Sequence, residues 1–188
     1  MEHEIEIEHH NPTNKRIGIV IAIMAAVLAF TEMAVRNADT DVVRETIEAS
    51  DTWAFFQAKT IRAAMLRADA RALQLQTAGR SDSDGAQVAK TVADWESTAA
   101  REDSEPSTGE GRKELAVRAQ AIEKNRDRRA AAKESYEFAS GALELGILLA
   151  SSAIVTGLLP LAFIGGAFGV IGAGLGLLGW FAPQIIVG

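Results

Sequence analysis

Carboxylates and cations are the groups in this 188-residue sequence that could do acid–base or ligand chemistry. The chain has no cysteine, which excludes disulfides, thiolate metal sites and thiol nucleophiles. Its histidines, His3, His9 and His10, all lie near the start of the chain, so a histidine-based triad in a folded core is not available. No phosphate-binding loop motif occurs. The sequence therefore predicts a protein that is not an enzyme and binds no cofactor.

The first 16 residues form an acidic tail that alternates Glu with Ile and ends in His9, His10 and a short polar stretch. Imidazole and carboxylate groups together could bind a divalent metal, but nothing in the sequence fixes their geometry. We interpret residues 1–16 as a solvated tail. Strand pairing between subunits and a metal site are the alternatives, and no metal ligand is assigned.

Two carboxylates, Glu32 and Glu144, stand in or at the end of otherwise apolar runs. A charge at such a position is costly unless it is paired or wet. Arg36 lies four residues after Glu32 and offers an ion pair along the helix. Glu144 has no basic residue after it. A ring of Glu144 side chains around a wet vestibule, or a proton-binding site, is the alternative to a simple surface charge.

Three apolar runs are long enough to cross a bilayer, since about 20 helical residues span its ~30 Å core. They predict transmembrane helices at residues 17–35, 141–159 and 161–182, with a hinge between the last two at Gly157 and Pro160. The first run also resembles a signal peptide, but an uncleaved anchor is the preferred interpretation.

Small residues recur in all three runs at alternating spacings of four and three, which places each set on one helix face. In lipid, helices associate where small residues let backbones approach closely. We therefore predict that these faces pack helices within and between subunits. The residues are Gly18, Ala22, Ala25 and Ala29; then Gly146, Ala150, Ala153 and Gly157; then Gly165, Gly169, Gly172, Gly176 and Gly179.

The region between the first two apolar runs, residues 36–140, is rich in strong helix formers. It predicts a long, coiled-coil-like helical hairpin with a turn at residues 79–85 and a break at 101–111. Because no proline occurs from Thr13 to Glu105, the first apolar helix can run unbroken into this region as far as Ala78. On the outgoing helix we expect an imperfect heptad seam. Its apolar members are Val43, Ile47, Ala54, Ile61, Ala64, Ala68 and Leu75. On the returning side, a short helix is marked by Val88, Val92, Trp95 and Ala99. A further helix is expected to bury Leu115, Ala119 and Ile122 and to continue through Tyr136, Ala139 and Leu143.

Residues 49–62 read ASDTWAFFQAKTIR. This stretch resembles the bacterial membrane-protein family catalogued as domain of unknown function 4337. Tyrosine is common in the family's aromatic pair. In this chain the pair is Phe55 and Phe56, which lack the tyrosine hydroxyl. The resemblance implies a bacterial membrane protein and carries no established activity. The family's pattern, a Ser-Asp-x-Trp followed by an aromatic pair and Gln-Ala-Lys, is matched by Ser50, Asp51, Trp53, Phe55, Phe56, Gln57, Ala58 and Lys59.

Trp53 and Phe56 are three residues apart on one helix face, where they can fill the gap between the two legs of the hairpin. Aromatic anchoring of the hairpin is the preferred interpretation. The alternative is a docking patch for a protein partner, built from Trp53, Phe56, Lys59 and Arg62.

The sequence as a whole predicts an all-α integral membrane protein of a bacterial inner (cytoplasmic) membrane. We expect a homo-oligomeric scaffold or docking assembly whose partners are membrane lipid, other copies of the chain and a protein at the hairpin. A net charge of −6 argues against a nucleic-acid partner. A pore or ion-conducting assembly with Glu32 and Glu144 at its mouth is the alternative. More Lys and Arg flank the hairpin side of the membrane than the other side, which predicts a cytoplasmic hairpin.

Overall fold

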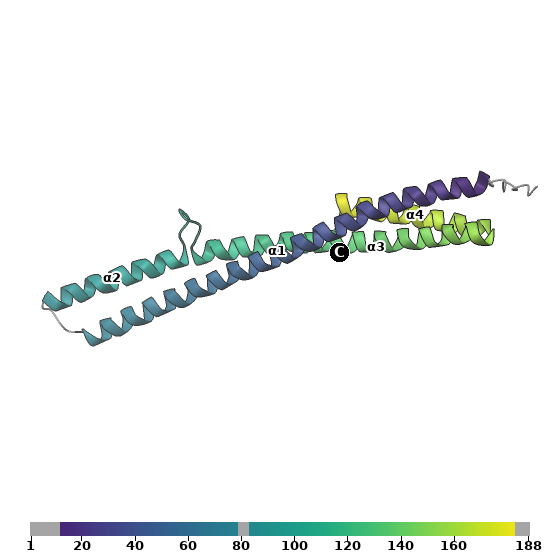
Figure 1. The fold of residues 1–188 in the computed structure, drawn as a ribbon. Helices are drawn as coiled ribbons and strands as arrows, with labels where there is room; N and C mark the ends of the chain where they lie inside the picture. Colours follow the sequence, from purple (N-terminus) through teal and green to yellow (C-terminus); the bar gives the residue numbers. More distant parts are fainter. Residues whose placement is uncertain (1–11, 79–82, 183–188) are drawn as a thin grey trace, which may run out of the picture. The chain divides into compact units, whose positions relative to one another are not determined.

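The computed structural model describes residues 12–78 and 83–182 (Figure 1). Within these ranges every regular element is an α-helix: α1 (Pro12–Gln76), α2 (Ser83–Asp103), α3 (Arg112–Thr156) and α4 (Leu159–Phe181). The predicted all-α class is therefore confirmed for the described residues. The histidine-containing part of the tail and residues 79–82 of the predicted turn lie outside them. Residues 83–85, also predicted as turn, belong to α2.

Three of these helices, α1, α3 and α4, are long and apolar enough to cross a membrane. This confirms the number of predicted spans. The hinge between the last two also has the expected form. Gly157 has a φ of +72°, a left-handed conformation that a residue with a side chain rarely adopts. Pro160 occupies the first turn of α4, where its missing N–H costs no helical hydrogen bond.

The expectation of a hairpin inserted as a distinct element is corrected by α1, which is one continuous helix of 65 residues. It carries both the first apolar run and the polar stretch that follows. The physical reason is local: no proline or glycine occurs between Gly18 and Gln76, so nothing interrupts the backbone hydrogen bonding. Helix α3, with 45 residues, likewise joins a polar stretch to an apolar one.

The chain divides into two compact units. The apolar unit comprises the described parts of Met1–Val42 and Asp127–Gly188, and the polar unit comprises those of Val43–Arg126. Helix α4 belongs to the apolar unit and α2 to the polar unit. Helices α1 and α3 contribute to both.

In the apolar unit, glycines let α3 and α4 approach at backbone distance. A Cβ added at Gly165 would lie 2.7 Å from the carbonyl oxygen of Gly146 and 2.9 Å from the amide nitrogen of Ala150. One added at Gly172 would lie 2.7 Å from Cγ of Leu143. Gly169 faces the Met24 side chain of α1. The α4 glycine face is thus occupied by the chain's own helices.

The other predicted small-residue positions divide between buried and open sites. Ala150 and Ala153 are almost fully buried, and Gly179 lies against Tyr136. A Cβ added at Gly176 would lie 3.8 Å from Oγ1 of Thr31 and 3.9 Å from Cβ of Ala139, which is ordinary contact. Along α1, a Cβ at Gly18 would meet no atom within 4 Å. The three alanines that follow on that face, Ala22, Ala25 and Ala29, are exposed.

In the polar unit, the seam predicted on α1 does not pack against the chain's own helices. Its large members are exposed: Val43 by 53%, Ile47 by 57%, Ile61 by 60% and Leu75 by 72%. The buried stripe lies on another face and holds mostly small or amphipathic residues, which allow two helices to pack closely. It consists of Ala49, Thr52, Phe56, Lys59, Ala63, Leu66, Ala70 and Leu73. On α2 and α3 the expected positions are buried at Val92, Ala99, Leu115 and Ala119 and half-buried at Val88, Trp95 and Ile122.

We predict that Gly172→Ala lowers the thermal stability of the detergent-solubilised protein, because the new methyl group collides with Leu143 and with the carbonyl oxygen of Ala139. Overpacking of this kind costs about 1–3 kcal/mol. The matched control is Gly174→Ala, which adds a methyl group to open space on the same helix. Equal melting temperatures for the two variants would contradict the assigned helix packing.

Candidate functional site

The segment that carries the family resemblance, residues 49–62, is part of α1 and contacts the end of α2 and the facing part of α3. Trp53 donates a hydrogen bond from Nε1 to Oε1 of Glu123 on α3, at 2.9 Å. Its ring meets Phe56 edge to face, with centroids 5.3 Å apart and an interplanar angle of 84°. Both aromatic side chains are half-buried. These contacts anchor α1 to α3 inside the polar unit.

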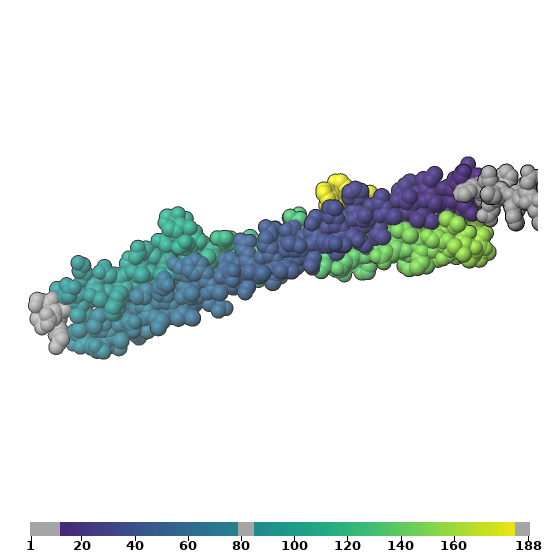
Figure 2. Space-filling view, viewed as in Figure 1, coloured from purple at the N-terminus to yellow at the C-terminus, as the bar shows by residue number. Residues whose placement is uncertain are grey.

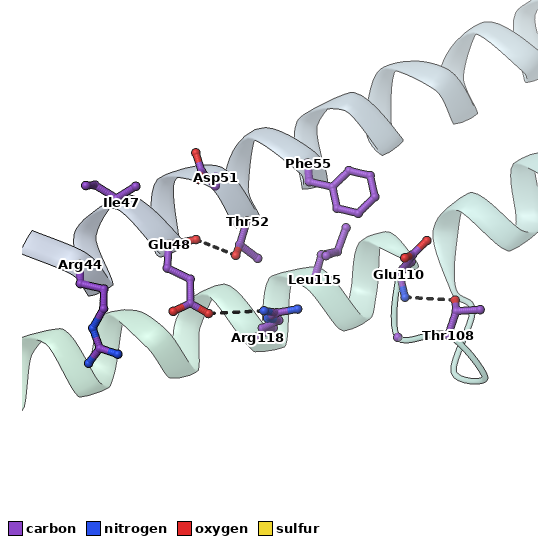
Figure 3. A pocket seen from close by; sticks show the side chains of 11 residues that line it. Arg44, Ile47, Glu48, Asp51, Thr52, Phe55, Thr108, Glu110, Leu115 and Arg118 are labelled. Atoms are coloured by element: carbon purple, nitrogen blue, oxygen red, sulfur yellow. Dashed lines mark hydrogen bonds and ion pairs between the residues drawn. The ribbon is translucent and has the colours of Figure 1, made fainter. Parts of the chain in front are cut away.

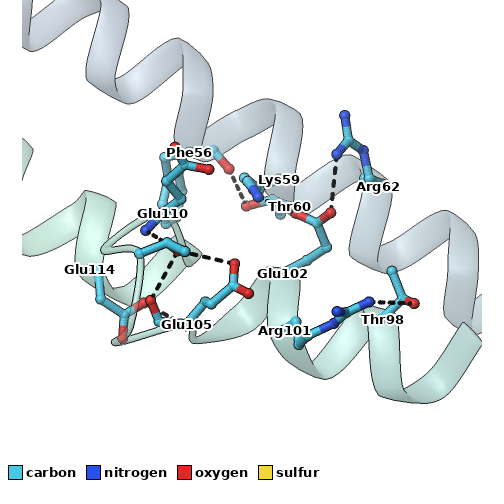
Figure 4. Close-up of polar contacts among 11 residues, drawn as sticks. Phe56, Lys59, Thr60, Arg62, Thr98, Arg101, Glu102, Glu105, Glu110 and Glu114 are labelled. Carbon is cyan, nitrogen blue, oxygen red and sulfur yellow. Dashed lines mark hydrogen bonds and ion pairs between the residues drawn. The ribbon is translucent and has the colours of Figure 1, made fainter. Parts of the chain in front are cut away.

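One turn further along α1, a buried carboxylate from α2 receives two cations (Figure 4). Nζ of Lys59 lies 2.8 Å from Oε2 of Glu102, and Nη1 of Arg62 donates to Oε1 at 3.1 Å. Glu102 and Lys59 are only 6% and 8% exposed. Lys59 also lies 5.4 Å from the centroid of the Phe55 ring, within range of a cation–π contact.

Burial by itself raises the pKa of the Glu102 carboxyl, because desolvation penalises its charged form. The hydrogen bonds and positive charges of Lys59 and Arg62 outweigh that effect, so the pKa lies below the ordinary value of 4.5. Glu102 is therefore ionised at neutral pH and forms a buried ion pair that links α1 to α2.

The neighbouring Asp103 extends this charge network to α3. It forms ion pairs with Arg67 of α1 and, at 3.1 Å, with Arg112 at the start of α3. Glu102 and Asp103 are the last two residues of α2, where the helix dipole disfavours negative charge. Cations supplied by the two neighbouring helices offset that unfavourable position.

The loop between α2 and α3 is closed by Glu114 in the first turn of α3. Its carboxylate accepts hydrogen bonds from Oγ of Ser104, at 2.7 Å, and from the amide of Glu105, at 3.2 Å. The Ser104 hydrogen bond is the main reason that the pKa of Glu114 is lowered. Gly111 is buried against Glu114 and the Glu105 backbone, and a Cβ there would overlap both. Gly109, with a φ of +71°, allows the loop to reverse.

A groove of about 510 Å³ lies beside this loop, between α1 and α3 (Figure 3). Ile47 and Phe55 border it from α1, and Leu115 contributes a buried apolar wall from α3. Arg118 crosses from α3 to Glu48 of α1, with nitrogen and oxygen 3.4 Å apart. This ion pair therefore engages two of the charged side chains that line the groove.

The structure thus brings Trp53, Phe56, Lys59 and Arg62 together as predicted neighbours, and directs most of their contacts to the protein's own helices. Arg62 retains a side chain that is 61% exposed. Sequence analysis missed Glu102, Glu114 and Glu123, because a glutamate in a helical or loop sequence gives no signal of its partner across the fold. In the part of the chain that the structure describes, no cluster of His, Asp and Glu side chains could hold a metal ion.

The second pair of predicted residues, Glu32 and Glu144, lies in the apolar unit. Arg36 Nη2 is 3.5 Å from Oε2 of Glu32, which is the ion pair expected along the helix. Glu144 is exposed, and both carboxylates line a cavity between α1 and α3.

Over residues 12–78 and 83–182, the fold and these contacts define an all-helical arrangement with three helices able to cross a membrane and a polar unit fixed by ion pairs between helices. The chain belongs to the family described as a domain of unknown function, DUF4337, whose model matches residues 13–182. The resemblance carried by residues 49–62 is therefore confirmed. No curated protein and no solved structure matches the chain significantly.

We predict that Glu102→Gln destabilises the polar unit by about 3–5 kcal/mol, because it leaves the buried Lys59 ammonium without its charge partner. The exposed Glu110→Gln in the same junction should have little effect. In the double variant Lys59→Met/Glu102→Leu, stability should be largely restored, since an apolar pair can replace a buried ion pair. Chemical unfolding followed by circular dichroism measures all three. Equal stabilities of Glu102→Gln and Glu110→Gln would contradict the proposed role.

The ion pair of Glu102 with Lys59 also makes the stability of the polar unit depend on pH. A carboxyl whose pKa is lowered in the folded state contributes stability that is present above its ordinary pKa of 4.5 and is lost as the pH falls through the lower folded value. Glu114 acts in the same direction. The wild-type protein should therefore lose stability on acidification below pH 4.5, and Glu102→Gln should lose less. An identical pH profile for the two proteins would contradict this assignment.

Proposed function

We propose that this protein is a non-enzymatic integral membrane protein that forms a homo-oligomeric scaffold or docking assembly. The polar unit, from residue 43 to residue 126, serves as its helical hairpin and as the contact surface between copies. One observation carries the proposal: α1 presents an apolar stripe in the polar unit that the chain's own helices leave uncovered.

The stripe follows the regular positions 47, 54, 61, 68 and 75, which hold Ile, Ala, Ile, Ala and Leu. Met65 lies between them and is 62% exposed, and Leu75 is 72% exposed. In the space-filling view, part of α1 over this range lies at the molecular surface (Figure 2). Single exposed apolar residues are ordinary on a protein surface, but a row at heptad spacing is typical of an interface.

A second copy of the chain is the occupant that fits this stripe best. Copies anchored in one bilayer share one orientation, so identical stripes meet in parallel and in register. In this register each Ile or Leu of the row meets the same residue of the second copy, so the large side chains form separate contact layers between layers of alanine. The α4 glycines, by contrast, are filled by the chain's own α3 and α1. The proposed contact between copies therefore relies chiefly on α1.

The experiment uses the absence of native cysteine. Ile61→Cys should form a disulfide between copies when membranes are treated with a mild oxidant, since position 61 meets position 61 in a parallel arrangement. Ser97→Cys, at an exposed site on α2, is the matched control and should form little. The pair Ile61→Glu/Met65→Glu should lower the mass of the detergent-solubilised complex and preserve helicity, because both side chains are exposed in the monomer.

Failure of Ile61→Cys to cross-link, together with an unchanged mass for the double glutamate variant, would rule out this surface. Equal cross-linking at positions 61 and 97 would indicate random collision rather than a specific interface.

We further propose that the protein resides in a bacterial inner membrane with the polar unit on the cytoplasmic side. Basic residues that flank the apolar runs support this orientation, since seven lie on the polar-unit side and two, Lys15 and Arg16, on the other. A membrane-impermeant thiol reagent should label Ser97→Cys only after spheroplasts are lysed. Labelling in intact spheroplasts would place the polar unit outside.

A further inference from the structure

A cavity of about 310 Å³ lies between α1 and α3 in the apolar unit. Its charged lining consists of Glu32 and Arg36 from α1 and Glu137 and Glu144 from α3. Gly141, which has no side chain to fill the space, lies at its wall. The cavity therefore combines one guanidinium with three carboxylates.

The charged side chains that line this cavity form only long ion pairs within the protein. Arg36 is 81% exposed at its side chain and Glu32 is 45% exposed, and their contact is 3.5 Å long. An exposed pair of this kind contributes little stability, so exchange for another partner costs little. Glu137 lies 3.7 Å from Lys133, whose ammonium is held more closely by Asp39 at 2.6 Å. Within the described chain, no ion pair involves Glu144.

The cavity stands where two apolar runs end. Arg36 directly follows the run 17–35, and Gly141 opens the run 141–159. One helical turn deeper on the same faces, apolar side chains replace the charged ones: Leu28 is half-buried before Glu32, and Leu148 is 62% exposed after Glu144. A ligand that fits both regions has a charged head and an apolar tail, and it lies at the depth of lipid headgroups.

We propose that this cavity binds the headgroup of a zwitterionic phospholipid whose amine is a primary ammonium, that is, a phosphoethanolamine lipid. The guanidinium of Arg36 takes the phosphate, since Arg binds phosphate through directed N–H donors. The carboxylates of Glu32 and Glu144 take the ammonium. A primary ammonium donates three hydrogen bonds to such oxygens, whereas a trimethylammonium donates none. A purely anionic headgroup is disfavoured because the cavity holds more carboxylates than cations.

The proposal is tested by native mass spectrometry of the delipidated full chain in detergent, titrated separately with phosphatidylethanolamine, phosphatidylcholine and phosphatidylglycerol. Phosphatidylethanolamine should bind most tightly. Glu144→Gln and Arg36→Gln should each weaken its binding by about two- to fivefold, the effect of one exposed ion pair. Glu134→Gln, an exposed carboxylate of the same helix that does not line the cavity, is the matched control and should leave binding unchanged.

Equal binding of the three lipids, or binding unaffected by both cavity variants, would overturn the proposal. Free phosphoethanolamine should not compete at comparable concentration, because it lacks the acyl chains that contact Leu28 and Leu148. Effective competition would identify a soluble ligand instead of a lipid. A change of bilayer conductance in Glu144→Gln, with lipid binding intact, would assign the cavity to an ion pathway.

Discussion

The ion pair of Glu102 with Lys59 and Arg62 is the interaction on which the arrangement of the polar unit depends. A buried carboxylate is tolerated only when cations and hydrogen-bond donors replace its lost hydration. That requirement fixes α2 against one turn of α1, and Asp103 then ties Arg67 of α1 to Arg112 of α3. An alanine-rich interface buries little apolar area, so it specifies helix register only weakly. The charge network supplies the register that alanine cannot.

In the apolar unit, too, small residues determine how closely the helices pack, but the physical reason differs. Inside a bilayer, apolar side chains gain little by leaving lipid for protein, so close backbone approach and its many van der Waals contacts hold helices together. The α4 glycines provide that approach to α3, where Gly165 and Gly146 leave no room for a side chain between them. The chain thus uses glycine between helices that are apolar enough to cross a membrane, and alanine with buried charge in the polar unit.

This division explains why the seam on α1 was assigned to the wrong face. The prediction followed the largest aliphatic residues, Ile47, Ile61 and Leu75, because burial usually follows hydrophobicity. The folded chain instead buries Ala63 and Ala70 to 1% exposure and leaves the large residues outside. Had the prediction weighed the heptad that runs through Ala49, Phe56, Ala63 and Ala70, the inner face would have been recognisable. The exposed row of Ile47, Ile61 and Leu75 is the surface that a second copy of the chain would contact in the proposed assembly.

The sequence by itself determined the helical class, the three membrane-length runs, the Gly157–Pro160 hinge and the family, because each rests on local propensity, run length or a contiguous motif. Tertiary structure alone decided that Trp53 meets Glu123, that Lys59 meets Glu102 across 43 residues of chain, and that Glu32 and Glu144 line one cavity. The reason is physical. A glutamate side chain is stable both on the exposed face of a helix and in an ion pair, so its sequence does not say which it forms. Only the packing of distant helices brings its partner within reach and removes the water that would otherwise solvate it.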